Sequence, residues 1–178
     1  SIEQCEQVVK ALAKFHGETF ETTAFSSIAR HNNEAQVSGM QAGFSAGWPM
    51  VKTLFPELIS DKAARLAPQI PEHLPALLED ITADPICISH GDMRLDNIFF
   101  GADHIALVDF QAISKSAPEH DLAYFLTQSP NDTVRNAKDW VALYHAELTA
   151  AGVTYPLEAC RHRYTQCALY FLCYAVVI

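Results

Sequence analysis

Residues 88–100, with the sequence ISHGDMRLDNIFF, place a run of polar side chains between two short apolar segments. The segment PICIS overlaps its start and is rich in β-branched residues, while NIFF closes it, so each is predicted to be a short strand. A polar loop that is held at both ends by buried strands can direct its side chains into one cleft. Loops on a rigid scaffold often carry catalytic groups, so this stretch predicts a functional loop.

The rest of the chain is predicted to be mostly helical. Apolar residues recur at helical spacing on both sides of the β-rich region, and a third apolar run, HIALVDF, follows NIFF after the turn sequence GADH. The pattern predicts a small β-hairpin region enclosed by helices, which is an α+β, mainly α fold. Helices are predicted over residues 2–15, 37–59 with interruptions at Gly47 and Pro49, 61–67, 71–82, 119–128, 131–151 and from 156 onward. Residues 21–35 are predicted to be a loop or a mobile helix-loop segment.

Composition narrows the class of protein. The 178 residues suffice for one domain, or for one lobe of a larger protein. A formal charge of −9 argues against a nucleic-acid partner, because phosphate backbones attract basic surfaces. The five cysteines form no C-x-x-C pair, and a reducing cytoplasm is the predicted location. The sequence shows no signal peptide and its apolar C-terminal run is too short to span a bilayer, so no membrane partner is expected.

Three oxygen-bearing side chains lie at predicted strand ends. Asp92 and Asn97 share the polar loop, and Asp109 follows the apolar run IALV. An Asp and an Asn supply the oxygen ligands that Mg²⁺ prefers, and a further Asp can orient a substrate hydroxyl and accept its proton. This is the minimum set for moving a phosphoryl group, because positioning and charge neutralisation supply most of the catalysis in that reaction.

The motifs around these residues resemble those of a known superfamily. HGDMRLDN resembles the H-x-D-x-x-x-x-N catalytic loop of kinase-like enzymes, and VDFQ resembles the metal-binding motif that follows it. Together with HDLAYFL, they resemble the aminoglycoside phosphotransferase and choline kinase group, and most of all its ecdysteroid-kinase-like branch. The resemblance implies ATP and Mg²⁺ as cofactors. It implies that Asp92 is the catalytic base, that Asn97 and Asp109 are the metal ligands, and that Arg94 contacts the transferred phosphate. Asp121 is implied to brace the catalytic loop through backbone hydrogen bonds.

The same resemblance implies an organisation in lobes. Residues 1–178 are expected to form the helical C-terminal, catalytic and substrate lobe of a protein-kinase-like fold. The sequence contains neither a G-x-G-x-x-G loop nor a V-A-I-K-like strand, so the N-terminal nucleotide-binding lobe is expected to be absent from this chain and to act as its partner. About a dozen residues separate Asp109 from Asp121, which leaves little room for docking a peptide, so a small hydroxylated molecule is the expected substrate. The acidic balance favours a cationic acceptor over an anionic one.

Two other functions stay open beside ATP-dependent phosphorylation of a small-molecule hydroxyl. A non-catalytic kinase-like binding module is one, although such modules commonly lose one of the three key residues. A metal-dependent hydrolase is the other, and it would not explain Asn97. Its candidate ligands would be His90, Asp92, His104, Asp109 and His120.

Several polar and aromatic residues near the motifs are expected to be structural. His90 is predicted to pack and hydrogen-bond under the loop, and Asp96 to stabilise a turn. His16, Glu119 and His120 are predicted to be structural or exposed. The aromatic residues at helical spacing are predicted to form core, with a cage for a cationic substrate as the alternative. They are Tyr124, Phe125, Tyr164, Tyr170, Phe171 and Tyr174.

Overall fold

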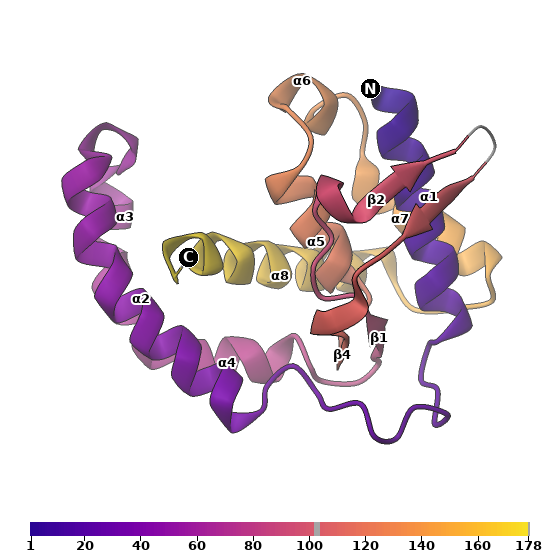
Figure 1. Ribbon diagram of the computed structural model, residues 1–178, viewed down its shortest axis with the longest axis horizontal. Coiled ribbons are helices and arrows are strands. Elements are labelled where there is room, and N and C mark those ends of the chain that lie inside the picture. Colours follow the sequence, from indigo (N-terminus) through magenta and orange to yellow (C-terminus); the bar gives the residue numbers. More distant parts are fainter. Residues whose placement is uncertain (102–103, 178) are drawn as a thin grey trace.

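The computed structural model describes residues 1–101 and 104–177, and it is mainly helical with two small antiparallel sheets (Figure 1). The predicted fold class, α+β and mainly α, is confirmed. The α-helices are α1 (Ile2–Glu18), α2 (Glu34–Leu54), α3 (Asp61–Leu66), α4 (Ile70–Asp80), α5 (Glu119–Gln128), α6 (Asp132–Arg135), α7 (Trp140–Ala150) and α8 (Leu157–Val177). Short 3₁₀ turns occupy Pro56–Leu58, Ala67–Gln69, Leu95–Asn97 and Phe110–Ala112.

The strands form two separate ladders. β1 (Cys87–Ser89) pairs with β4 (Ser114–Ser116), and β2 (Ile98–Phe100) pairs with β3 (Ile105–Leu107). The predicted hairpin between NIFF and HIALVDF is confirmed as β2–β3, but the second of these strands ends at Leu107. β4 was not predicted, because its sequence SKS is polar. It is held extended by its pairing with the fully buried β1 and by the hydrogen bonds of Lys115 to Ala29 and His31 on its other edge.

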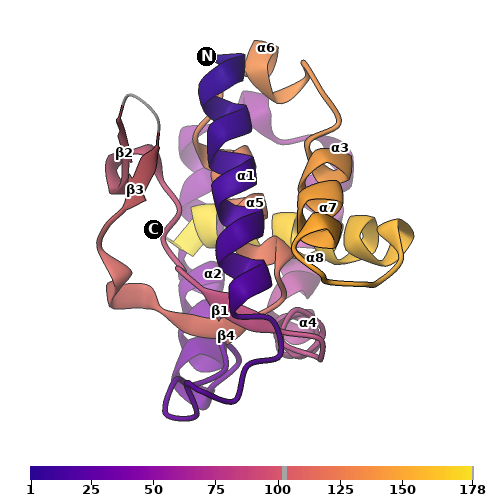
Figure 2. The same ribbon diagram turned by 90° about the vertical axis from the view of Figure 1, so that its right-hand side faces the viewer.

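Helix α1 follows its predicted amphipathic pattern. Ser1 caps it through a reciprocal pair of hydrogen bonds with Gln4, and its buried face includes Val8, Val9 and Leu12. This face packs against α7, beside which α1 lies in Figure 2. The loop predicted over 21–35 is non-helical up to Asn33, whose side chain caps α2 by accepting a hydrogen bond from the N–H of Gln36.

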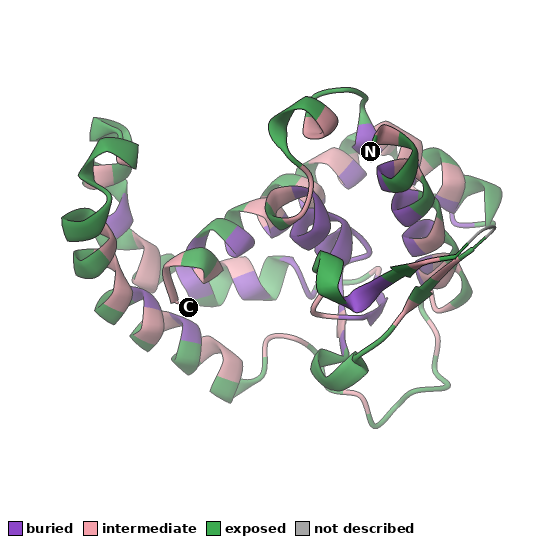
Figure 3. Ribbon diagram, turned by 45° about the horizontal axis from the view of Figure 1, so that its top comes forward, coloured by how far each residue is buried: buried purple, intermediate pink, exposed green. Residues whose placement is uncertain are grey.

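Helix α8 is the central element of the core. It crosses the molecule between the α2–α4 pair on one side and α5 and α7 on the other (Figure 1). Figure 3 shows the buried residues gathered on α5, on the inner face of α1 and along α8. All five cysteines are buried free thiols, as expected for residues on apolar stripes.

Two helix predictions are wrong in detail. Helix α2 continues through Gly47 and Pro49. A Cβ on Gly47 would lie 2.0 Å from the Val176 carbonyl oxygen, so this glycine permits close packing on α8. Pro49 is tolerated because it and Ser45 are exposed, so water can bond the Ser45 carbonyl that lacks a helical partner.

The helix predicted over 131–151 is two helices, α6 and α7. The chain leaves the helical path after Arg135, and the Asp139 side chain starts α7 by accepting a hydrogen bond from the N–H of Ala142. The indole N–H of Trp140 bonds the carbonyl oxygens of Val134 and Arg135, which fixes the corner. Within the described residues, no helix is long and apolar enough to cross a membrane.

Candidate active site

The polar loop between β1 and β2 holds Asp92 and Asn97 against each other. The side-chain amide of Asn97 donates to the Asp92 backbone oxygen at 2.9 Å and to its carboxylate Oδ2 at 3.0 Å. Asn97 is buried and Asp92 is half-buried. With its N–H groups directed at Asp92, the amide of Asn97 is left with its oxygen, Oδ1, to offer to a ligand.

His90 lies under this loop and joins it to the next one. The ring is fully buried, its Nε2–H donates to the Val108 carbonyl oxygen at 2.9 Å, and its Nδ1 accepts from the Asp92 N–H at 3.3 Å. The ring also packs on Phe110, with centroids 4.4 Å apart. The predicted structural role of His90 is confirmed by these contacts, because both ring nitrogens bond the backbone.

Asp121 of α5 braces the loop from below. Its carboxylate accepts hydrogen bonds from the backbone N–H groups of His90, at 2.6 Å, and Gly91, at 2.9 Å. The bracing role implied by the sequence is therefore confirmed. Burial opposes ionisation of this carboxyl, but hydrogen bonds from His120 and His16 outweigh it and hold the pKa of Asp121 well below its usual value. The loop thus rests on a buried negative charge.

Asp109 lies in the second loop, between β3 and β4, in a strained conformation. Its φ is 65° and its ψ 64°, the left-handed region that non-glycine residues rarely adopt. Such a conformation costs about 1–3 kcal/mol and is concentrated at functional sites. The side chain is exposed. The predicted strand ends before Asp109 because this backbone geometry cannot continue a ladder.

The two loops are tied together at two places. The Val108 N–H donates to the Asn97 carbonyl oxygen at 3.1 Å, beside the His90 bond to Val108. At Gly91, where φ is +85°, an added Cβ would lie 2.2 Å from the Ala112 carbonyl oxygen. Val108, the residue before Asp109, is therefore bonded to His90 at one end of the polar loop and to Asn97 at the other. These bonds bring Asp92, Asn97 and Asp109 into one region.

Arg94 and Asp96 form an exposed ion pair at the edge of this region. The Arg94 guanidinium lies 2.8 Å from Asp96 Oδ2, and both side chains are more than half exposed. An ion pair this exposed contributes little to stability. The turn at Asp96 was predicted, whereas its pairing with Arg94 was not.

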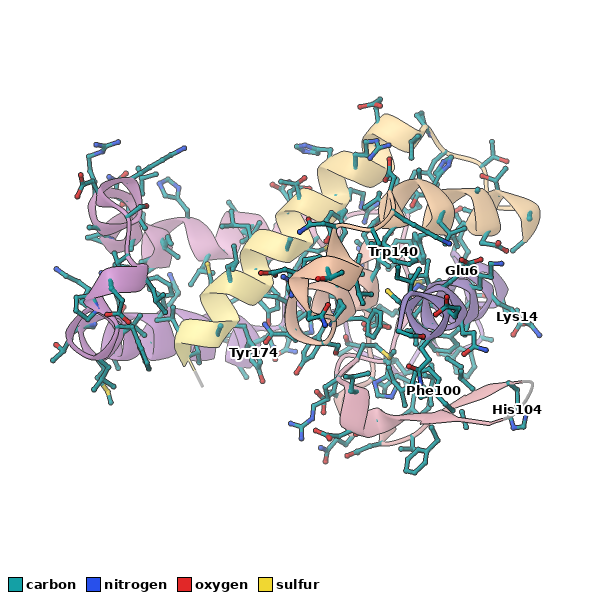
Figure 4. All side chains as sticks on the ribbon, turned by 90° about the horizontal axis from the view of Figure 1, so that it is seen from above. Glu6, Lys14, Phe100, His104, Trp140 and Tyr174 are labelled. Atoms are coloured by element: carbon teal, nitrogen blue, oxygen red, sulfur yellow. The ribbon has the colours of Figure 1, made fainter. Side chains whose placement is uncertain are left out.

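The donors in the two loops fit Mg²⁺, which prefers a few protein oxygens and keeps several waters. Asn97 offers an amide oxygen and Asp109 an exposed carboxylate, and neither is a soft ligand. Over residues 1–101 and 104–177, no group of three or more His, Cys, Asp or Glu side chains converges as a metal site. Figure 4 places His104 near the far end of the β2–β3 hairpin, while His120 is fully buried under α8. The five candidate ligands of a hydrolase are therefore not brought together.

A pocket of about 220 Å³ opens beside the Asp92 loop. Gly91 and residues 111–114 form one wall. A second wall consists of His120 and Tyr124 of α5 and Tyr170, Phe171 and Tyr174 of α8, and residues 29–31, Asn33 and Gln36 complete the lining. Burial, followed by the nearby Asp92 carboxylate, raises the pKa of Tyr124. No carboxylate is among the described residues of its lining, so the pocket gives no support to the predicted cationic acceptor.

The aromatic cluster divides between core and pocket. Phe125, Tyr170 and Phe171 are buried, as predicted for core residues, and Tyr170 and Phe171 also line the pocket together with Tyr124 and Tyr174. His31, from the loop before α2, was missed entirely. Its Nε2 lies 2.9 Å from the Tyr170 hydroxyl, 139 residues away in sequence. No local pattern in the sequence could have identified such a contact.

Glu119 forms a second buried contact that the sequence did not indicate. The Tyr155 hydroxyl donates to its carboxylate, and the Arg163 guanidinium of α8 lies 3.7 Å from the other oxygen. Burial raises the pKa of Glu119, while Tyr155 and Arg163 act in the opposite direction. Glu119 therefore ties α5 to α8, which agrees with its predicted structural role.

The chain matches a protein-family model. A family model described as the ecdysteroid kinase-like family matches residues 1–153, which include both loops and Asp121. No curated protein matches the chain.

Proposed function

We propose that this chain, which belongs to the ecdysteroid kinase-like family, transfers a phosphoryl group from ATP to a hydroxyl group of a small molecule. Family membership supports a kinase-like phosphotransferase in general. The finer assignment rests on one observation: Asp92, Asn97 and Asp109 lie on two loops that are bonded to each other through Val108 and packed together at Gly91. These are the oxygen-bearing groups that phosphoryl transfer requires.

Asp92 is the proposed base. Its Oδ2 accepts from Asn97, which fixes the carboxylate and leaves Oδ1 for the acceptor hydroxyl. As the acceptor oxygen bonds the γ-phosphorus of ATP, its proton passes to Asp92, and the bond from that phosphorus to the bridging oxygen breaks to release ADP. The half-buried position of Asp92 beside the 220 Å³ pocket suits this role.

Asn97 and Asp109 are the proposed ligands of Mg²⁺, through the amide Oδ1 and the exposed carboxylate. When bound, the metal would neutralise charge on the phosphate oxygens. Arg94 is proposed to contact the transferred phosphate, and for this its guanidinium must leave Asp96. We also propose a cytoplasmic setting, in which the five buried cysteines stay as thiols.

The test is a screen of hydroxylated small molecules for acceptor-dependent ADP release by the full-length protein. Asp92→Asn serves as the blank, and Asp61→Asn, an exposed position on α3, is the matched control. We expect one class of acceptor to stimulate ADP release, with a loss of about 10²–10⁴-fold in Asp92→Asn and none in Asp61→Asn. Stimulation that is equal in both variants would reject Asp92 as the base, and no stimulation by any acceptor would reject the proposed reaction.

A further inference from the structure

One nitrogen in the wall of the pocket beside Gly91 has no hydrogen-bond partner among the described residues. It is Nε2 of His120, a fully buried residue at the start of α5. A buried polar atom without a partner costs about 1–3 kcal/mol, and such atoms in native proteins call for an explanation. A ligand in the pocket would supply the missing partner.

The hydrogen bonds on the other side of the ring assign its tautomer. The Ser89 hydroxyl donates to Asp121 Oδ1 at 3.3 Å, so its oxygen is left to accept from His120 Nδ1–H, 3.2 Å away. Asp121 Oδ1 itself lies 3.5 Å from the same Nδ1. In the neutral ring these contacts hold the proton on Nδ1, and Nε2 carries a lone pair. In that tautomer Nε2 accepts a hydrogen bond and has none to donate.

The polar groups around His120 are already paired. The Tyr170 hydroxyl lies 2.9 Å from His31 Nε2 and 3.3 Å from the Gln36 side-chain nitrogen. The His31 Nδ1 in turn lies 3.4 Å from the Ser114 hydroxyl. His120 Nε2 differs from these neighbours because it alone, among the described histidines that line this pocket, is buried without a partner.

A ligand must displace a neighbouring ring to reach this nitrogen, since the atom has almost no exposed surface. The rings of His31, Phe171 and Tyr170 surround His120, with centroids 4.7, 4.8 and 5.9 Å from its own. Phe171 and Tyr170 are buried on the central helix, whereas His31 is half-buried and belongs to the loop before α2. The His31 ring is therefore the one that can turn aside at the smallest cost.

We propose that His120 Nε2 recognises the acceptor by accepting a hydrogen bond from one of its hydroxyl groups. This inference rests on the proposed function, because it takes the pocket beside Asp92 as the acceptor pocket. The Asp92 carboxylate also needs a hydroxyl proton, so the two sites together require a molecule with at least two hydroxyl groups. An ether or a ketone in the second position has no proton to donate to His120, and such a molecule would bind less well.

Two fragments test the recognition without any phosphoryl transfer. Resorcinol carries two hydroxyl groups on a flat ring, and 3-methoxyphenol keeps one of them but has an ether oxygen without a proton in place of the other. Their dissociation constants are measured by ligand-observed NMR with the full-length protein, in the absence of ATP and Mg²⁺. We expect resorcinol to bind about tenfold more tightly, the ratio for one net hydrogen bond. Equal affinities, or no binding of either fragment, would overturn the proposal.

A matched pair of variants assigns the effect to Nε2. His120→Gln places an amide near the position of Nε2, and His120→Asn places one near the position of Nδ1, beside Ser89. If Nε2 binds the hydroxyl, the preference for resorcinol persists in His120→Gln and falls in His120→Asn. If His120 only supports Ser89 and Asp121, the preference persists in His120→Asn, and the proposal fails.

Histidine-selective ¹⁵N labelling gives a measurement on the unaltered protein, should either variant fail to fold. The Nε2 resonance of His120 is expected to have the shift of an unprotonated nitrogen and to move on addition of resorcinol. An unmoved resonance would mean that the fragment does not contact Nε2, and the proposal would fail. Because neither measurement involves ATP, a failure here is distinguishable from a failure of the phosphotransferase assignment.

Discussion

Replacing Gly91 by Ala tests whether the two loops of the site depend on their close contact. The backbone of Gly91 has a φ of +85°, and the added Cβ would lie 2.2 Å from the Ala112 carbonyl oxygen and 2.9 Å from its carbon. A left-handed conformation costs an L-residue about 1–2 kcal/mol, and forcing an extra carbon into a packed contact costs about 1–3 kcal/mol. We expect a total loss of about 2–5 kcal/mol in the free energy of unfolding.

Gly152→Ala is the matched control. Gly152 has a φ of +92°, but nothing lies within 4 Å of an added Cβ. This variant should therefore lose only the conformational part, about 1–2 kcal/mol. The difference between the two variants isolates the contact between Gly91 and Ala112. In a chain of this size each kcal/mol corresponds to about 2–4 °C in Tm.

The assay is urea and thermal unfolding followed by circular dichroism, together with ADP release in the full-length protein. Gly91→Ala should also lower kcat, because separating the loops shifts Asp109 relative to Asp92, whereas Gly152→Ala should leave kcat unchanged. Equal losses of stability in the two variants would refute the reasoning, since the contact with Ala112 would then contribute nothing. A destabilised Gly91→Ala with the parent kcat would show that the contact does not position the site.

Three further predictions concern other features. In the full-length protein, Asp92→Asn should lower kcat about 10²–10⁴-fold and leave the nucleotide Kd unchanged. The defects of Asp109→Asn and Asn97→Ala should shrink as the Mg²⁺ concentration is raised. If added Mg²⁺ restored the activity of Asp92→Asn alone, the assignment would be reversed. Burial lowers the pKa of His31 from 6.5 to about 3, so below pH 6.5 the unfolded chain takes up the proton first. Urea midpoints should therefore fall between pH 6.5 and about 3, and a His31→Gln variant that falls as steeply would contradict this. Gly39→Ala, in α2 with nothing within 4 Å of the added Cβ, should raise the free energy of unfolding by about 0.5–1 kcal/mol; a lower urea midpoint would count against it.

Local patterns were enough to predict most of the helices and the β2–β3 hairpin. The spacing of Val8, Val9 and Leu12 identifies the buried face of α1, and the turn sequence after NIFF identifies the hairpin. These features depend on neighbours in sequence. β4 depends instead on β1, a partner strand far away in sequence: Ser114 pairs with Ser89, 25 residues earlier, and Ser116 with Cys87, 29 residues earlier. The polar sequence of β4 itself does not predict a strand.

In the candidate site, too, some features could be predicted from the local sequence and others could not. Asp92, Asn97 and Asp109 could be named from the sequence because they occur in motifs with fixed spacing. The pocket beside them could not, because its walls come from residues 29–36, from 111–114 and from α5 and α8. His120 was predicted to be structural or exposed, and only the arrangement of the rings around it reveals the unpaired Nε2.

The carboxylate of Asp121 has a consequence for the motions of the loop above it. Loops usually exchange their amide hydrogens quickly, because they open without disturbing the core. Here the amides of His90 and Gly91 are bound to a buried group that also lies 3.0 Å from His16 of α1. Opening of the loop breaks two hydrogen bonds to this buried carboxylate and leaves its charge without them. The amides of His90 and Gly91 are therefore expected to exchange more slowly than those of a loop that is bonded only to solvent.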